Sequence, residues 1–379
     1  MSVEVIAIGG YEEVGKNMTV FRYGDEIIVI DAGMAFPDET MPGVDIVIPD
    51  FSYLIENRDK IKAILITHGH EDHIGSLAYL LRDVSAPVYA TRLTCGLIEG
   101  KLKEQKIGKY NLNVVKTGDE FRRGSFRFGF FHVCHSIPDS CGVYVRTPIG
   151  TVVHTGDFKF DQAADKFYKT DFSRLAEIGN EGVLALLSDS ANADSNEQGA
   201  SMHEAREEIL NTIADWDGRI IVAAVASNIV RIQQIFDAAE KTGRRIVLTG
   251  HDVENIVRTA IQLKKLHLVS EKLLVKPKDI AKYEDHELII LETGRMGEPL
   301  NGLRKMAIGR HRYVEIKDGD LVYIVTTPSI SKEAVVARVE NLVYKAGGVV
   351  QSIAKKLRVS GHGSSRDLQL MMNIMKPKY

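Results

Sequence analysis

The sequence predicts a mixed α/β fold in two parts, with chemistry at strand ends in the first part. Residues 1 to about 190 contain many short apolar runs and few helical patterns, whereas residues from about 195 to 354 alternate between strand and helix patterns. Three histidines and an aspartate crowd between His68 and His73. At 379 residues the chain is long enough for two domains.

The first part is expected to consist mainly of strands. We predict them at residues 3–8, 27–30, 61–66, 88–89, 125–134, 142–146, 151–154 and 183–187. Candidate metal-binding or catalytic side chains recur where these strands end, at Asp31, His68, His135, Asp157 and Asp189. Such side chains converge when the strand ends meet at one edge of a sheet, even if they lie far apart in sequence.

The second part is expected to form a parallel sheet with helices on both faces, because strands and helices alternate along it. We predict strands at 220–225, 246–249, 288–292, 321–326 and 349–352, and helices at 229–240 and 253–264. Residues 357–359 then read as a return strand. The second part is therefore predicted to be inserted into the first, with domains at 1–194, 195–354 and 355–379.

The run His68-Gly69-His70-Glu71-Asp72-His73 is the most informative local feature. It follows an apolar run at 63–66 that reads as a buried strand, and apolar residues at helical spacing follow it. Imidazole nitrogens with a carboxylate are a ligand mix that zinc takes. The alternative, a surface loop that happens to be rich in histidine, is disfavoured by the H-x-H-x-D-H spacing.

Composition describes an ordinary globular chain, with 44% apolar and 26% charged residues. No run approaches the length needed to span a bilayer, and the first residues show no signal-peptide pattern. The three cysteines form no C-x-x-C pair and suit a reducing compartment. We therefore expect a cytoplasmic protein with no membrane partner. A net charge of −3 neither supports nor excludes nucleic-acid binding, because a cleft can be locally basic.

Several motifs together resemble the metallo-β-lactamase fold and, within it, the β-CASP nucleases of the ribonuclease J family, nearest to its archaeal branch. They are the histidine run and the segments 9–18, 135–140, 154–161, 188–192, 226–228, 293–299 and 359–364. The resemblance implies a metallo-β-lactamase αββα sandwich with an inserted β-CASP parallel-sheet α/β domain. It departs from the family at Arg295-Met296, where Ser-Gln is usual.

The resemblance also implies a site with two zinc ions. His68, His70 and His135 would hold one zinc, Asp72 and His73 the other, and Asp157 would bridge both. Asp31 would orient the metal loop through hydrogen bonds. The catalytic residues would be Asp72 together with Asp189 and His362, which resemble the acid pair of the family.

A pocket for a 5′-monophosphate is implied at Ser227, Asn228, Gly363 and Ser364. Each assignment has a plainer alternative: His135 as a hydrogen-bonded core histidine, Asp31 and His362 as turn residues, and the serines and Asn228 as helix caps. The companion motifs favour the functional interpretation for the metal ligands most strongly.

The function implied is a zinc-dependent ribonuclease acting 5′→3′ on single-stranded RNA with a 5′-monophosphate, in RNA decay and processing, and assembling as a homodimer. One alternative is an endoribonuclease of the same fold. Another is an RNA-binding protein with weakened catalysis, because a further metal-binding histidine of the family is expected beyond Tyr379. On this view the C-terminal end of the first domain is truncated, and the second metal is held by fewer ligands.

Overall fold

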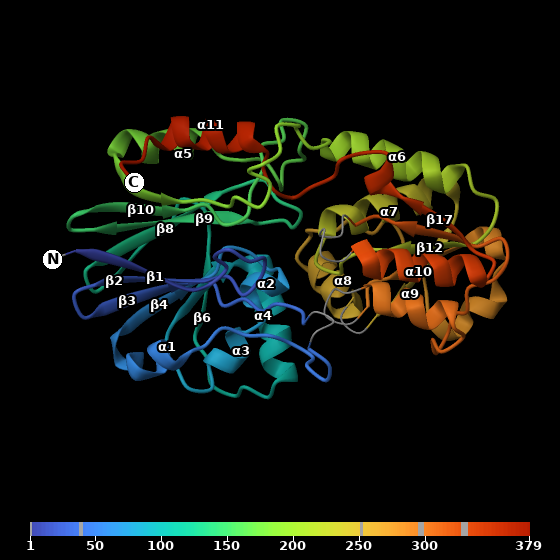
Figure 1. The fold of residues 1–379 in the computed structure, drawn as a ribbon, viewed down its shortest axis with the longest axis horizontal. Coiled ribbons are helices and arrows are strands. Elements are labelled where there is room, and N and C mark those ends of the chain that lie inside the picture. Colours follow the sequence, from blue (N-terminus) through green and yellow to red (C-terminus); the bar gives the residue numbers. More distant parts are fainter. Residues whose placement is uncertain (1, 38–40, 251–252, 295–298, 327–332) are drawn as a thin grey trace. The chain divides into compact units, whose positions relative to one another are not determined.

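The computed structural model describes residues 2–37, 41–250, 253–294, 299–326 and 333–379 (Figure 1). The chain divides into two compact units, the first comprising Met1–Gln198 and Gly361–Tyr379 and the second Gly199–Ser360. The predicted boundaries fall a few residues earlier. Residues 355–360 stay with the second unit because Lys356 pairs with Glu208 and the Arg358 carbonyl accepts the N–H of Ala200 at 2.7 Å.

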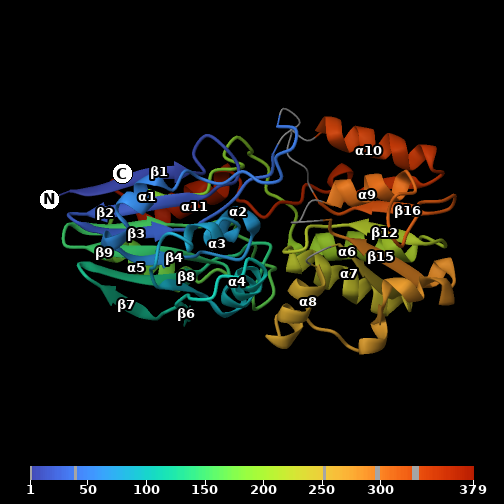
Figure 2. The same cartoon turned by 90° about the horizontal axis from the view of Figure 1, so that it is seen from below.

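The first unit contains two sheets within the described residues. One has the order β1-β2-β3-β4-β5-β6, antiparallel from β1 to β3 and parallel from β3 to β6. Its strands are β1 (Val3–Gly9), β2 (Met18–Tyr23), β3 (Glu26–Ile30), β4 (Ile61–Leu65), β5 (Val88–Thr91) and β6 (Leu112–Val115). Figure 2 shows β1 and β6 on opposite sides of this unit, as that order requires.

The other sheet has the order β11-β10-β9-β8-β7, antiparallel except for the parallel pair β10 and β11. Its strands are β7 (Glu120–Arg123), β8 (Phe126–His132), β9 (Cys141–Thr147), β10 (Gly150–His154) and β11 (Val183–Leu187). The last two residues of the chain bond along β11, where the N–H of Tyr379 donates to Leu184 O at 3.0 Å.

The phenylalanines of β8 show why this sheet is covered on both faces. Phe126, Phe128 and Phe130 alternate along the strand and pack into the core shared with the first sheet, whereas Phe131 belongs to a separate core with residues of helices α5 and α11. Successive side chains of a strand point to opposite faces, so β8 buries phenylalanines on both faces, although Arg127 is exposed. The result is the predicted αββα sandwich.

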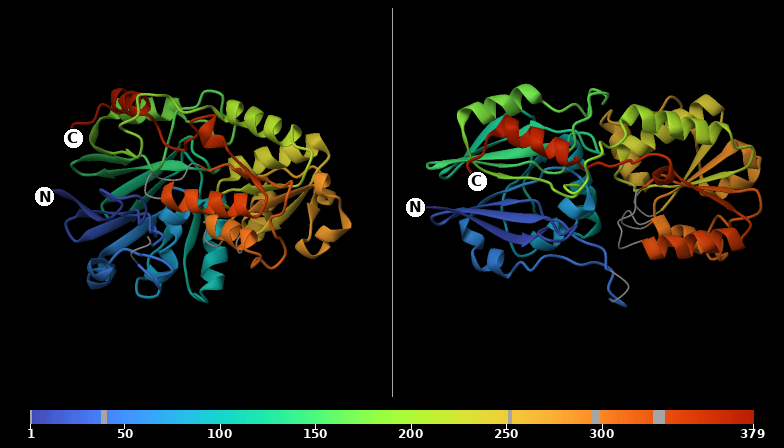
Figure 3. Two further views of the ribbon diagram at one scale, coloured as in Figure 1. Left: turned by 45° about the vertical axis from the view of Figure 1, so that its right-hand side comes forward. Right: turned by 45° about the horizontal axis from the view of Figure 1, so that its top comes forward.

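The helices of the first unit cover the outer faces of the two sheets (Figure 1). They are α1 (Ser52–Glu56), α2 (Glu71–Ile74), α3 (Leu77–Leu80), α4 (Arg92–Glu104), α5 (Phe172–Glu181) and α11 (Ser365–Met375), with the short 3-10 helix η1 (Arg58–Lys60). The red helix α11 lies beside the green helix α5 (Figure 3), although they are far apart in sequence. Packing against α5 thus returns the end of the chain to the first unit.

The second unit is built on one parallel sheet of order β14-β13-β15-β12-β16-β17 within the described residues. Its strands are β12 (Ile220–Ala223), β13 (Arg245–Thr249), β14 (Leu274–Val275), β15 (Leu288–Glu292), β16 (Leu321–Ile324) and β17 (Val349–Ser352). Buried runs such as Leu288–Glu292 are apolar almost throughout because helices cover both faces of a parallel sheet.

Helices α6 and α7 lie on one face of that sheet, and α9 and α10 lie on the other (Figure 1). The helices are α6 (Met202–Ala214), α7 (Ile229–Thr242), α8 (Val253–Gln262), α9 (Pro299–Ala307) and α10 (Glu333–Lys345), with η2 (Glu271–Leu273), η3 (Pro277–Lys282), η4 (Asp285–Glu287) and η6 (Ile353–Lys355). The strand and helix alternation expected from the sequence is confirmed.

Some elements differ from the sequence prediction. The return strand expected at 357–359 is wrong, because these residues form no regular strand and Arg358 instead receives an isolated backbone hydrogen bond from Ala200. Strands β2, β6, β7 and β14 and helices α1, α4, α5, α6, α9, α10 and α11 were not predicted. Strand β7 has three exposed charged residues among its four, so it carries little apolar signal.

Among the described residues, no helix has both the length and the apolar character that crossing a bilayer requires.

Candidate metal centre

Four side chains of the first unit converge on one point. His68 Nε2 and His135 Nε2 lie 3.2 and 3.1 Å from His70 Nδ1. Asp157 Oδ2 lies 3.7 Å from His68 Nε2 and 3.6 Å from His135 Nε2. Tetrahedral ligands about 2.1 Å from a zinc ion would be separated from one another by about 3.4 Å. The spacing and the donor types of this first ligand group therefore fit a tetrahedral metal ion.

A second ligand group shares one residue with the first. It consists of Asp72, His73 and Asp157, whose donor atoms all lie within 4.8 Å of one another. His73 Nε2 is 3.3 Å from Asp157 Oδ1 and 3.6 Å from Asp72 Oδ2. Asp157 thus presents Oδ2 to the first group and Oδ1 to the second, which is the arrangement of a carboxylate that can bridge two ions.

Each of the four histidines has a partner at the ring nitrogen that points away from the ligand groups. His135 Nδ1 donates to Gly361 O at 2.8 Å, and His70 Nε2 lies 3.2 Å from Ser136 Oγ. Such outer partners set the tautomer and leave the other nitrogen as a lone-pair donor. The Cβ of any residue at 361 would stand 2.7 Å from His135 Cε1, so this contact requires glycine.

Asp31 holds the other two histidines. Its Oδ2 accepts from His73 Nδ1 at 2.8 Å and from Thr67 Oγ1 at 2.9 Å, while Oδ1 accepts the N–H of Thr67 at 2.8 Å. Because the Thr67 hydroxyl gives its proton to Asp31, its oxygen accepts from His68 Nδ1 at 3.0 Å. One buried carboxylate therefore fixes the tautomer of one histidine in each ligand group, that of His73 directly and that of His68 through Thr67. The parallel pairing of β3 and β4 brings Asp31 and Thr67 together.

The electrostatics of the first ligand group favour the protonation states that bind metal ions. Burial, reinforced by neighbouring imidazoles, lowers the pKa of His68 and His70 well below the usual value. Burial likewise lowers the pKa of His135 to about 4. Burial alone would raise the pKa of Asp157, but His73 and His362 hold it well below its usual range. Neutral imidazoles and an ionised carboxylate are what a metal ion requires at neutral pH.

His73 has the opposite shift. Burial would lower its pKa, but the surrounding carboxylates of Asp157, Asp72 and Asp31 raise it well above the usual value. Three carboxylates around one imidazole attract any positive charge, whether a proton or a metal ion. A metal ion at Nε2 would therefore replace a proton at that atom.

Asp189 and His362 form a pair next to the ligand groups. His362 Nδ1 lies 2.8 Å from Asp189 Oδ2 and 3.9 Å from Asp157 Oδ2. Asp189 is itself fixed by the N–H groups of Phe158 and Ala191, at 3.2 and 2.9 Å. Burial would lower the pKa of His362, yet the two aspartates raise it to about 9. The two aspartates therefore favour the protonated imidazole, in which both nitrogens can donate.

The four predicted phosphate contacts are divided between the two units. Ser227 and Asn228 belong to the second unit, whereas Gly363 and Ser364 belong to the first. Asn228 Oδ1 caps α7 by accepting the N–H of Arg231 at 3.1 Å.

The two first-unit contacts are engaged as well. The N–H and hydroxyl of Ser364 both donate to Asp367 at the start of α11, and the N–H of Gly363 donates to Phe158 O. Helix capping thus accounts for Asn228 and Ser364, and their role toward a phosphate stays a prediction.

The sequence interpretation missed three residues that shape the site: Asn17, Thr67 and Ser136. Thr67 and Ser136 each adjoin a predicted ligand, and that adjacency was the available signal. Asn17 lies in the 9–18 segment, which had been singled out without a role. The unusual pair Arg295-Met296 lies outside the described residues.

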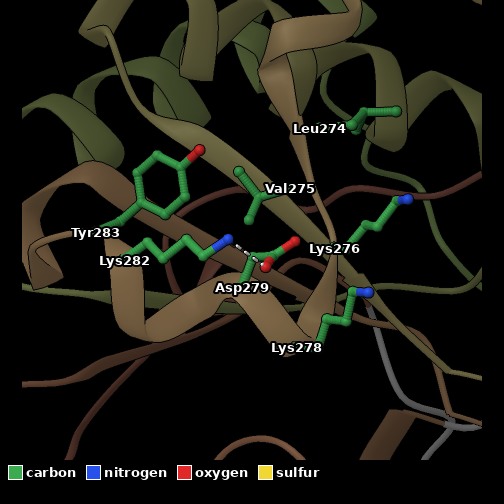
Figure 4. A pocket seen from close by; sticks show the side chains of 7 residues that line it. All are labelled: Leu274, Val275, Lys276, Lys278, Asp279, Lys282 and Tyr283. Carbon is green, nitrogen blue, oxygen red and sulfur yellow. Dashed lines mark ion pairs between the residues drawn. The ribbon is translucent and has the colours of Figure 1, made fainter.

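A shallow depression of about 420 Å³ lies elsewhere, in the second unit (Figure 4). Strand β14 and helix η3 form it, and it is lined by Leu274, Val275, Lys276, Lys278, Asp279, Lys282 and Tyr283. Lys282 pairs with Asp279 at 2.8 Å. The depression contains none of the predicted site residues. The candidate active site is therefore placed at the two ligand groups of the first unit and not at this depression.

Comparison with known proteins agrees with this architecture. The metallo-beta-lactamase superfamily model matches residues 11–198, and the model for the beta-CASP domain of ribonuclease J matches residues 217–343. These two matches define the chain as a metallo-β-lactamase fold with a β-CASP insertion. A crystal structure of a protein of unknown function from Enterococcus faecalis V583 has the same fold, with a TM-score of 0.71 and 14% identity over 99% of this chain and 92% of that one.

Sequence relatives narrow the family. Ribonuclease J 2 of Streptococcus pyogenes is 58% identical over 379 residues, covering all of this chain and 68% of that protein. Ribonuclease J2 of Bacillus subtilis is 41% identical with the same coverage, and ribonuclease J of Thermus thermophilus is 42% identical, with 67% of that protein covered. The chain belongs to the ribonuclease J family. These relatives are bacterial, so the finer placement in the archaeal branch stays a prediction.

Proposed function

We propose that this protein is a metal-dependent ribonuclease that hydrolyses phosphodiester bonds of single-stranded RNA in the 5′→3′ direction, using two zinc ions. The observation that carries the proposal is the pair of ligand groups sharing Asp157. RNA as the substrate is supported by the names of the relatives, which are ribonucleases J and J2.

The residues present suit zinc, since they offer imidazole nitrogens and carboxylates with their tautomers fixed from outside. His68, His70 and His135 would hold one ion, Asp72 and His73 the other, and Asp157 both. When bound, two such ions supply a nucleophilic water and offset the charge of the reacting phosphate.

The chain itself supplies the proton for the leaving group. Hydrolysis adds the oxygen of water to phosphorus and breaks the bond to the 3′-oxygen, which must take up a proton. Asp189 accepts a hydrogen bond from His362 Nδ1 at 2.8 Å and so favours the protonated imidazole, whose Nε2 can deliver that proton. Asp189 keeps the ring oriented and stabilises its charge. General acid catalysis of this kind contributes about 10²- to 10⁴-fold in rate.

The proposed 5′→3′ direction depends on a binding site for the 5′-monophosphate of the RNA. Ser227 and Asn228 precede α7, and Gly363 and Ser364 precede α11, and helix N-termini favour phosphate groups. An exonuclease that anchors a 5′-monophosphate at these segments would release mononucleotides. An endonuclease would not need the terminal phosphate, and it remains the alternative.

The direct test compares two RNAs of one sequence, one with a 5′-monophosphate and one with a 5′-hydroxyl. We expect faster loss of the monophosphorylated RNA, with mononucleotides as products, from zinc-loaded protein. His362→Gln serves as a folded control that should retain metal and RNA binding but cleave slowly. Equal rates with internal fragments would support the endonuclease, and RNA binding with no cleavage under any metal would support a binding protein.

Location and assembly belong to the same proposal. Cys95, Cys134 and Cys141 are free and buried, which suits the reducing cytoplasm. A homodimer is expected from the family resemblance, and light scattering of the purified protein at several concentrations tests it.

A further inference from the structure

Asn17 lies at the end of the glycine-containing segment 9–18 and reaches the second ligand group. Its backbone N–H donates to Asp72 O at 3.0 Å. Its side-chain Nδ2 lies 3.1 Å from the same carbonyl, 3.5 Å from Asp72 Oδ2 and 3.1 Å from His73 Nε2. Within the described part of the chain, the hydrogen bonds of this carboxamide go to Asp72 and His73.

The surroundings fix which end of the carboxamide faces the site. Asp72 offers two acceptors, its backbone carbonyl and its carboxylate. His73 gives its Nδ1 proton to Asp31, so in its neutral, metal-binding form it carries a lone pair at Nε2. An amide oxygen turned toward Asp72 would meet only acceptors. The NH₂ end is therefore the end that points at the second ligand group.

Two glycines allow Asn17 to sit so close. The N–H of Gly33 donates to Asn17 O at 2.9 Å, and a Cβ at position 33 would stand only 1.6 Å from Asp72 O. Gly10 has a φ of +84°, and a Cβ there would stand 2.5 Å from Asn17 Oδ1. Both faces of Asn17 are thus closed by backbone, so its carboxamide has little freedom to turn.

We propose that Asn17 is a positioning residue for the second metal ion, acting through Asp72. The amide nitrogen donates to the Asp72 carbonyl at 3.1 Å and lies 3.5 Å from the Asp72 carboxylate and 3.1 Å from His73 Nε2, so it favours the Asp72 orientation that faces His73 and Asp157. The assignment rests on the two-metal site of the proposed function. It gives the segment 9–18 a physical role, which is to hold the second ligand group from the side opposite Asp31.

The test measures metal binding instead of turnover. Metal-free wild-type protein and Asn17→Ala are titrated with zinc against a chromophoric chelator, and zinc per chain is measured by mass spectrometry. Loss of an outer partner of a ligand weakens a metal site about 10- to 100-fold. We expect that loss for the second zinc of Asn17→Ala, with the first zinc unchanged. Asn113→Ala is the matched control, because Asn113 Nδ2 also donates to a backbone carbonyl, that of Val88.

A second variant separates positioning from direct ligation and guards against misfolding. Asn17→Asp keeps the shape but replaces the N–H donors with oxygen, so it too should bind the second zinc more weakly. Unchanged affinity for both ions in folded Asn17→Ala would overturn the inference while leaving the two-metal proposal intact. Tighter binding by Asn17→Asp would identify an oxygen ligand at this position and overturn the positioning role. A wild type that binds one zinc only would refute the two-metal site, and the role of Asn17 with it.

Discussion

Replacing Asp31 with asparagine should disable the second metal ion through a change of proton positions at nearly constant shape. The side-chain oxygen of the introduced asparagine must still accept the N–H of Thr67, because that backbone donor cannot change. The new NH₂ group then faces Thr67 Oγ1 and His73 Nδ1, both donors to Asp31 in the wild type. His73 must move its proton to Nε2, the atom that would bind the metal ion.

The magnitude follows from the bonds lost. Losing the outer partner of His73 should weaken the second ion about 10- to 100-fold, or about 1.4–2.8 kcal/mol. The first ion should weaken less, because His68 is linked to Asp31 only through Thr67. Hydrogen bonds to a buried charge contribute about 1.5–3 kcal/mol each. The new NH₂ group conflicts with the hydroxyl of Thr67 and with Nδ1 of His73, and rotation of the hydroxyl relieves the first conflict. Because the side chain at position 31 is only 1% exposed, the remaining conflict should lower the free energy of unfolding by about 3 kcal/mol.

The assay combines chelator-competition titration with thermal unfolding of the metal-free protein. Asp320→Asn is a matched control, since Asp320 is fully buried and accepts from Arg219 and from Lys317 in the second unit. The control should lose stability but keep both metal ions. Folded Asp31→Asn with two zinc ions at wild-type affinity would refute the reasoning that Asp31 sets the tautomer of His73.

Two further predictions concern other parts of the first unit. Gly361→Ala should weaken the first metal ion and lower stability by about 1–3 kcal/mol, because the added Cβ displaces the His135 ring; calorimetry and zinc titration measure both, and an intact first site would contradict it. Burial raises the pKa of the Cys95 and Cys134 thiols to about 12, so native protein should resist iodoacetamide at pH 8 and react after unfolding. Mass spectrometry follows this reaction, and rapid labelling of the native protein would show that these thiols become exposed.

Several residues of the candidate metal centre could be named from the sequence because they follow apolar runs. His68 follows β4, Asp157 follows β10 and Asp189 follows β11. These strand ends were expected to meet at one edge of a sheet, whereas β4 belongs to one sheet of the sandwich and β10 and β11 belong to the other. The resemblance to a known family then supplied which of them share a metal ion, a grouping that spacing alone does not determine.

The helix caps show where sequence interpretation was less decisive. Asn228 and Ser364 were predicted as phosphate contacts with capping as the alternative, and the structure shows both in caps. A serine or asparagine before a helix has the same sequence signature in either role. Only the position of the acceptor or donor that it meets can distinguish them.

The sequence by itself indicated a strand-rich first part, the inserted parallel-sheet unit and the histidines and aspartates able to bind metal ions, because periodicity and motif spacing are local properties. The αββα sandwich followed from the resemblance to a known family. The tertiary structure alone decided which atoms of these residues face each other. It placed Asp31 against both Thr67 and His73, turned the two oxygens of Asp157 to different groups, and brought Asn17 against Asp72. The contacts of Asp31 and Asn17 join residues separated by 36 to 55 positions, and they arise from strand pairing and close backbone approach that no local pattern encodes.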